Sequence, residues 1–243
     1  MMKILLGVLT FAALSGGGTL AWQASRNTAP IVESAYVSDT EQAQLAPRRL
    51  IIGLDISKSN PLIDNPDFAA KVGAKIADEV SKLGFASEVH VRTFGSYDAG
   101  MNNFAFDAVL SVRNRPENVA AEVEKLVAGT PMLVQRGRFH PQDYTNILGF
   151  LDNMNESVGC DAMPTTIVLA SDGIEDSELA HLDNAESHLP APDGRPYRGC
   201  AELEILGIGQ GTKSPTKTTR LRNEWSRWAQ QAGFPRFIGL NDW

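Results

Sequence analysis

Apolar positions along the chain fall into short continuous runs separated by stretches with helical spacing. The continuous runs predict strands that are buried on both faces of a sheet. Their ranges are 50–54, 88–94, 104–112, 165–170, 203–207 and 237–240. In the stretches between them, apolar residues recur every three or four positions, which predicts helices. The helical ranges are 66–83, 116–127, 145–158 and 218–232.

The alternation of strands and helices predicts the fold class, and one short link refines it. Strands that alternate with helices form a mostly parallel, doubly wound sheet with helices on both faces. Only nine residues separate the strand that ends at Phe94 from the one that begins at Phe104. A parallel crossover needs a dozen or more residues, so this link predicts a hairpin. We therefore expect an α/β fold with one antiparallel edge strand.

The beginning of the chain has a different pattern. Lys3 is followed by 19 residues without a charge, 4–22. Such a run is long for the apolar part of a signal peptide and just long enough to span a bilayer. We expect residues 1–24 to be a signal peptide or an N-terminal membrane anchor, 25–48 a polar linker and 49–243 one domain. Either interpretation places the domain outside the cytoplasm, in the periplasm or anchored to the membrane and facing it.

Composition and charge narrow the function classes. Hydrophobic residues make up 43% of the chain and charged residues 21%, as in ordinary globular proteins. The net charge of -7 argues against a nucleic acid as partner, because nucleic-acid-binding domains present a basic surface. The sequence has no phosphate-binding glycine loop, nucleophile elbow or His-Glu-x-x-His pattern. We therefore expect that the protein is not an enzyme.

Oxygen-bearing side chains follow the predicted strands at their carboxyl ends, where doubly wound sheets bind ligands. Asp55, Ser57 and Ser59 follow the first strand, Thr145 begins a predicted helix, and Asp172 follows a later strand. Two carboxylates and three hydroxyls offer only oxygen ligands, which suit a hard cation such as Mg²⁺, Mn²⁺ or Ca²⁺. With so few carboxylates, such a cation would keep waters or accept a carboxylate from outside.

These five residues resemble the metal-ion-dependent adhesion site of von Willebrand factor A domains, and the resemblance covers roughly residues 49–241. It implies that the three hydroxyls hold the ion directly or through water, and that Asp55 and Asp172 bind it or orient its waters. It also implies that a protein partner supplies a Glu or Asp to the open position. In this family the site binds and does not usually catalyse. The gap of 90 residues from Asp55 to Thr145 is long, and the extra length lies in 129–143.

Two alternatives from other function classes stay open. A metal-dependent nuclease or phosphohydrolase would use Asp55, Asp172 and Asp176 to hold catalytic Mg²⁺. Such sites usually gather three or four carboxylates, whereas hydroxyls dominate here. The other alternative is a purely structural scaffold of the cell envelope with a vestigial site. Glu175 and Asp176 are candidates for groups that support the metal ligands without binding the ion, but we favour a solvated acidic loop.

The only two cysteines of the chain, Cys160 and Cys200, shortly precede the predicted strands at 165 and 203. In an exported protein, two cysteines suggest one disulfide. The resemblance implies that these strands are parallel neighbours, which would place both cysteines at the same edge of the sheet, opposite the metal. A disulfide there would close a loop of about 40 residues.

Overall fold

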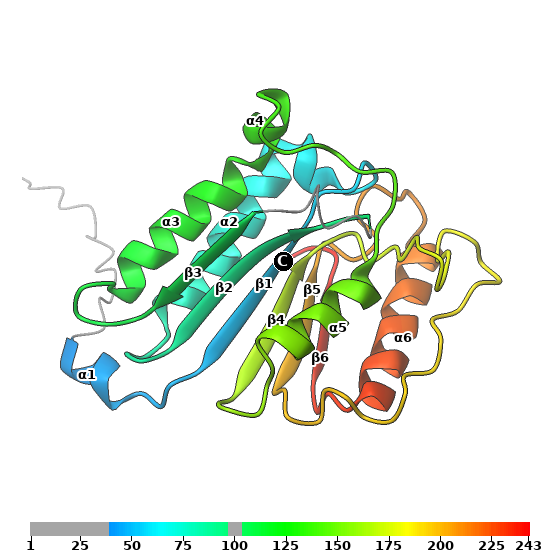
Figure 1. Ribbon diagram of the computed structural model, residues 1–243. Helices are drawn as coiled ribbons and strands as arrows, with labels where there is room; N and C mark the ends of the chain where they lie inside the picture. The colour runs from blue at the N-terminus through cyan, green and yellow to red at the C-terminus, as the bar shows by residue number, and fades with distance from the viewer. Residues whose placement is uncertain (1–38, 97–103) are drawn as a thin grey trace, which may run out of the picture. The chain divides into compact units, whose positions relative to one another are not determined.

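The computed structural model describes residues 39–96 and 104–243 (Figure 1). The predicted signal peptide or anchor, 1–24, lies outside the described residues, as does most of the predicted linker. The described end of that linker contains a short helix, α1 (Asp39–Gln44). Within the described part of the chain, no helix is both long and apolar enough to cross a membrane.

Six strands form one mixed sheet in the order β3-β2-β1-β4-β5-β6. β3 pairs antiparallel with β2 at one edge, and every other neighbouring pair is parallel. The predicted fold class and its antiparallel edge strand are thereby confirmed. The strands are β1 Arg49–Asp55, β2 Glu88–Phe94, β3 Ala105–Val109, β4 Thr165–Ala170, β5 Glu202–Leu206 and β6 Phe237–Leu240.

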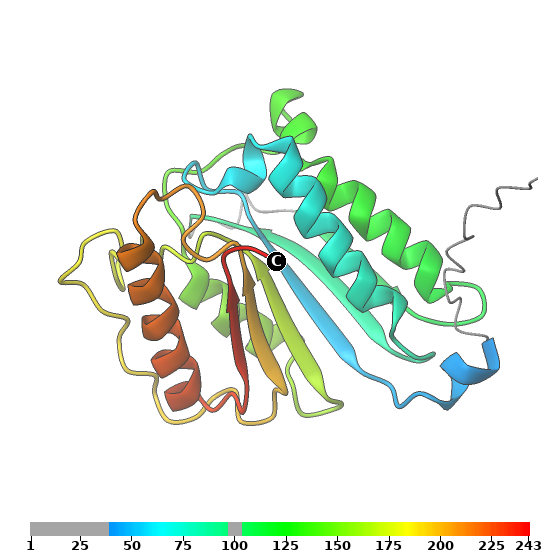
Figure 2. The same ribbon diagram turned by 180° about the vertical axis from the view of Figure 1, so that it is seen from behind.

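Helices cover both faces of the sheet (Figures 1 and 2). α2 and α3 pack on one face, and α5 and α6 pack on the other. A short 3-10 helix, η1, contacts the short helix α4. The bounds are η1 Pro61–Ile63, α2 Pro66–Ser81, α3 Pro116–Ala128, α4 Thr130–Gln135, α5 Ile147–Ser157 and α6 Pro215–Ala232.

Local sequence explains α2. The side chain of Asn65 accepts a hydrogen bond from the backbone N of Phe68 at 3.1 Å, and Pro66 occupies the first turn. Both features favour a helix start. Val72 and Ile76 lie on the buried face of the helix, against the sheet.

β1 is the central strand, and all seven of its residues are buried. Its side chains alternate between two apolar layers, as the pleat of a strand requires. Leu50, Ile52 and Leu54 face α2 and α3, whereas Ile51 faces α5 and α6. Since β1 is paired on both sides, its last residue, Asp55, is delivered to the interior of the carboxyl edge, the edge formed by the carboxyl ends of the parallel strands.

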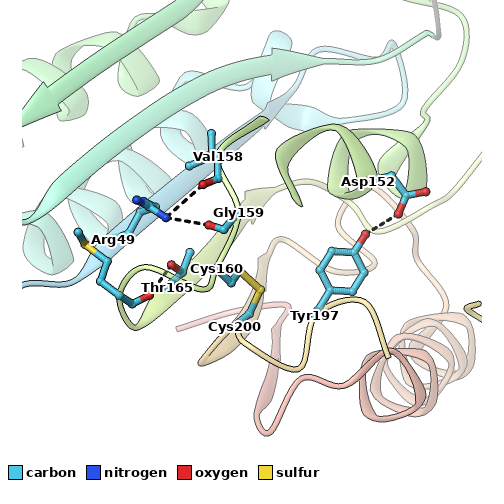
Figure 3. Close-up of a disulfide and its surroundings, with 9 residues drawn as sticks. Arg49, Asp152, Val158, Gly159, Cys160, Thr165, Tyr197 and Cys200 are labelled. Atoms are coloured by element: carbon cyan, nitrogen blue, oxygen red, sulfur yellow. Dashed lines mark hydrogen bonds between the residues drawn. A yellow bond between two sulfur atoms is a disulfide. The ribbon is translucent and has the colours of Figure 1, made fainter. Parts of the chain in front are cut away.

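A disulfide joins Cys160 and Cys200 at the opposite, amino edge of the sheet (Figure 3). The two Cα atoms are 4.9 Å apart, within the usual range for a disulfide. Cys160 precedes β4 and Cys200 precedes β5, and these strands are parallel neighbours. The disulfide that the resemblance implied is therefore confirmed.

The long segment between β4 and β5 is anchored more firmly than its pattern predicts. Leu182, Leu189 and Tyr197 are buried in the layer formed with α5 and α6. The hydroxyl of Tyr197 also donates a hydrogen bond to Asp152 of α5 at 2.6 Å (Figure 3). These apolar residues are isolated in the sequence, so they have no periodicity from which burial can be predicted.

The disulfide predicts a measurable contribution to stability. Replacing both cysteines, Cys160→Ser with Cys200→Ser, frees a loop of 40 residues in the unfolded chain. We expect the free energy of unfolding to fall by about 3–4 kcal/mol, as estimated from loop entropy. Urea denaturation measures this change, and the reduced wild-type protein should behave like the double variant. Two free thiols in protein purified from an oxidising compartment, detected by intact mass, would contradict the prediction.

Candidate metal centre

The candidate site lies where β1 and β4 end, in the middle of the sheet, and these ends point upward in Figure 1. From β1 the chain continues to β2 on one side, and from β4 it continues to β5 on the other side. Doubly wound sheets bind ligands at this kind of switch in strand order. Asp55 is the last residue of β1, and Asp172 follows the end of β4 at Ala170.

The carboxylate of Asp55 is buried and connects the two strand ends. Its Oδ1 accepts a hydrogen bond from the backbone N of Ser57 at 2.8 Å. Its Oδ2 accepts one from the hydroxyl of Ser171 at 2.7 Å. Burial raises the pKa of Asp55 to about 6, although the hydrogen bonds from Ser57 and Ser171 oppose the rise.

The loop after β1 brings two predicted hydroxyls together. The hydroxyl oxygens of Ser57 and Ser59 are 3.2 Å apart. Ser57 is buried and Ser59 is exposed, so the site is accessible from solvent at Ser59. Asn60, which the sequence pattern did not indicate, holds this loop in place. Its side-chain Nδ2 donates to the carbonyl oxygens of Asp55 at 2.8 Å and Ala170 at 3.0 Å, so it ties the two strand ends together.

Asp172 carries the atom that points most directly to a cation. Its Oδ1 accepts a hydrogen bond from the backbone N of Ile174 at 2.9 Å. Its Oδ2 is buried and accepts no hydrogen bond from the residues that the structure describes. Burial and the charge of Asp55 raise the pKa of Asp172 to about 7, although the nearby Ser59 hydroxyl opposes the rise. A buried carboxylate oxygen without a partner is costly unless a proton or a cation satisfies it.

Thr145 is held beside the loop that carries Asp172. The backbone N of Thr145 donates to the carbonyl oxygen of Asp176 at 3.1 Å, and the backbone N of Asp176 donates back at 2.8 Å. Thr145 is buried, with 2% of its surface exposed. The prediction that the helix starts at Thr145 is wrong, because α5 begins at Ile147 and Asn146 is its N-cap.

Glu175 overturns our interpretation of the acidic loop. Its side chain is fully buried, and Oε2 accepts hydrogen bonds from the backbone N of Ile147 at 2.8 Å and of Leu148 at 3.1 Å. Its Oε1 accepts one from the hydroxyl of Ser177 at 2.5 Å. Burial raises the pKa of Glu175 to about 7. The sequence could not show its burial or its partners, because the two backbone donors lie 28 and 27 residues away along the chain.

The predicted ligands are typical of a site with two carboxylates and several hydroxyls, and not of a site built from three or more carboxylates. Asp176 is partly exposed, and its Oδ1 lies 2.6 Å from Nδ1 of His181. In residues 39–96 and 104–243, no group of three or more His, Cys, Asp or Glu side chains is arranged to hold a metal ion. The two buried carboxylates of Asp55 and Asp172, with hydroxyls near them, form an oxygen-only set that suits Mg²⁺.

Comparisons with known proteins give a likeness of fold. No family model and no curated protein matches the chain. An aerotolerance-related membrane protein from Bacteroides fragilis NCTC 9343 shares 12% identity with a TM-score of 0.41, over 80% of this chain and 92% of that one. The conserved hypothetical protein BatB from Bacteroides thetaiotaomicron shares 13% with a TM-score of 0.40, over 80% of this chain and 91% of that one.

A third solved structure is a pilus adhesin, SpaC from Lactobacillus rhamnosus GG in an open conformation. It shares 10% identity with a TM-score of 0.45, and the match covers 82% of this chain but only 28% of the adhesin. At such identities and scores, these likenesses concern the fold and carry no information about ligands or partners.

The two buried carboxyls predict how stability depends on pH in the absence of metal. The pKa values of Asp55 and Asp172 are raised from 3.8 to about 6 and about 7, so the folded protein holds protons that the unfolded chain releases. The free energy of unfolding should therefore fall as the pH rises from about 4 to about 7, and then level off.

Asp172→Asn tests this prediction because it cannot release a proton. Urea denaturation in EDTA measures the free energy of unfolding of both proteins. Between about pH 4.5 and pH 8, this free energy should fall by about 2–4 kcal/mol less in the variant than in the wild type. A smaller slope should remain, because the pKa values of Glu175 and Glu204 are also raised by burial. Asp193→Asn, in an exposed loop, should follow the wild type. Equal slopes for Asp172→Asn and wild type would refute the assignment.

Proposed function

We propose that this chain is an exported module that binds a protein partner through a divalent metal ion at the carboxyl edge of its sheet. The observation that supports this most strongly is the buried Oδ2 of Asp172, which accepts no hydrogen bond from residues 39–96 and 104–243 and lies beside the buried carboxyl of Asp55. Burial, and after it the charge of Asp55, raises the pKa of Asp172. A cation between the two carboxyl groups would lower their pKa values, because opposite charge favours the ionised carboxylates.

The five proposed ligand residues would have two different roles. Asp55 and Asp172 would supply negative charge, and Ser57, Ser59 and Thr145 would supply neutral oxygens. The two carboxylates carry just enough negative charge to neutralise a divalent ion such as Mg²⁺, with Mn²⁺ and Ca²⁺ as alternatives. The bound ion would supply an open coordination position for a Glu or Asp carboxylate of the partner.

Exposed side chains next to the site support a protein as the partner. Tyr144 precedes Thr145 and is 56% exposed, and Leu179 follows the loop of Asp172 and is 49% exposed. The bridge between Thr145 and Asp176 brings these two segments of the chain together. A partner could therefore bury apolar surface beside the metal contact, in the way that most protein interfaces are stabilised.

The proposed location is outside the cytoplasm, in the periplasm or anchored to the membrane and facing it. The disulfide between Cys160 and Cys200 supports this location, because disulfides persist in oxidising compartments. The uncharged run at 4–22 would be the export signal or the anchor.

The hydrolase alternative has less support. It requires Asp176 as a third carboxylate on the metal. The side chain of Asp176 is paired with His181 instead, and it is 40% exposed, whereas Asp55 and Asp172 are buried.

A metal titration of the purified protein tests the proposal. After removal of metal with EDTA, Mg²⁺ or Mn²⁺ at pH 8 should raise the melting temperature with concentration, because the ion binds the native state alone. The stabilisation should reach about 2.7 kcal/mol at 100 times the dissociation constant. Thr145→Ala should respond much less, whereas Thr219→Ala, on the exposed side of α6, should respond like the wild type.

The other outcomes separate the alternatives. An equal response from wild type and Thr145→Ala would mean that the carboxylates alone hold the ion, as in the hydrolase alternative. If neither protein responds, the site is vestigial and the scaffold alternative is favoured.

A further inference from the structure

Glu175 is outside the five proposed ligands, yet its contacts join two of the segments that carry them. It lies three residues after Asp172, in the loop that follows β4. Its carboxylate binds the first turn of α5, which directly follows Thr145. The side chain therefore connects the loop of one proposed ligand to the segment of another.

The helix start explains why a carboxylate belongs at this position. The first backbone N–H groups of a helix have no partner within the helix, and the positive end of the helix dipole favours an anion there. The side chain of Asn146 accepts from the backbone N of Gly149 at 2.7 Å. Glu175 accepts from the two preceding N–H groups, those of Ile147 and Leu148. A residue from a distant segment thus completes the cap of α5.

Backbone hydrogen bonds extend the same connection to Thr145. Thr145 and Asp176 exchange two hydrogen bonds, and the backbone N of Leu182 donates to the carbonyl oxygen of Glu175 at 2.8 Å. Hydrogen bonds therefore hold both the backbone and the carboxylate of Glu175. These bonds and the carboxylate of Glu175 tie the segment of Thr145 to the loop that follows β4 at two adjacent places.

Glu175 also adds charge close to the proposed ligands. Its side chain is fully buried, and it interacts electrostatically with Asp55. Charges in a buried environment are weakly screened, so a third buried carboxylate strengthens the attraction for a divalent cation. It does so without occupying a coordination position.

We propose that Glu175 is a positioning residue of the metal centre. Its carboxylate holds the Thr145 segment against the loop of Asp172, and its negative charge increases the affinity for the ion. This inference rests on the proposed function, because it requires that the five residues bind a metal.

Two substitutions separate the two roles. Glu175→Gln removes the charge but can keep the geometry, since the amide oxygen can accept from Ile147 and Leu148 while the amide nitrogen faces Ser177. Glu175→Asp keeps the charge, but its shorter side chain reaches the first turn of α5 poorly. Asp176→Asn is the matched control, because it removes a charge at the next position, where the side chain is paired with His181.

The experiment is calorimetric titration of the purified proteins with Mn²⁺ at pH 8. We expect Glu175→Gln to bind about 5- to 20-fold more weakly than wild type without a fall in melting temperature in EDTA, because the amide avoids the cost of a buried charge, and Asp176→Asn to bind within about twofold of wild type. Combining each change with Thr145→Ala shows whether Thr145 is positioned by Glu175. The loss caused by Thr145→Ala should be smaller in the Glu175→Asp background than in wild type, because coupled residues are not additive.

Each result decides a separate point. If wild type binds no Mn²⁺, the proposed function and this inference both fail. If wild type binds and Glu175→Gln matches it, or if the effects of Thr145→Ala and Glu175→Asp simply add, the inference about Glu175 fails while the metal centre stands.

Discussion

Two carboxylic acids, Asp55 and Asp172, are buried next to each other where β1 and β4 end. Burying two acidic groups costs free energy, and the structure around them must offset that cost. Parallel pairing favours the burial, because β1 has a strand on each side and Asp55, its last residue, is fully buried. Unpaired buried charge is expensive, so the metal-free site must hold protons or expose its carboxylates. A bound cation offers a third solution, in which both groups are ionised and stabilised.

Hydrogen bonds from polar groups hold the geometry of the candidate site. Ser171 binds Asp55, and Asn60 binds the carbonyl oxygens at the ends of both strands. Glu175 joins the loop after β4 to the first turn of α5. Each of these side chains satisfies backbone or carboxylate groups that would otherwise be buried without partners. Preorganisation of this kind reduces the ordering cost of binding.

Stability is supplied mainly away from the site. Two apolar layers enclose β1, and the disulfide with the buried Tyr197 fastens the long segment between β4 and β5 at the amino edge. The polar carboxyl edge, by contrast, has an exposed residue, Ser59, next to the buried Ser57. This separation allows loops at one edge to be shaped for a ligand while the rest of the sheet holds the fold.

The sequence by itself determined the sheet and its antiparallel edge strand, because strand and helix periodicity are local properties. The metal ligands stay a prediction from the residues at the strand ends. The sequence also predicted that the two cysteines form a disulfide, once neighbouring parallel strands were assumed. Only the tertiary structure decided the contacts of Asn60 and Glu175, and it moved the start of α5 from Thr145 to Ile147. A side chain whose partners lie 28 residues away leaves no periodic pattern. Its burial depends on how separate loops meet in space.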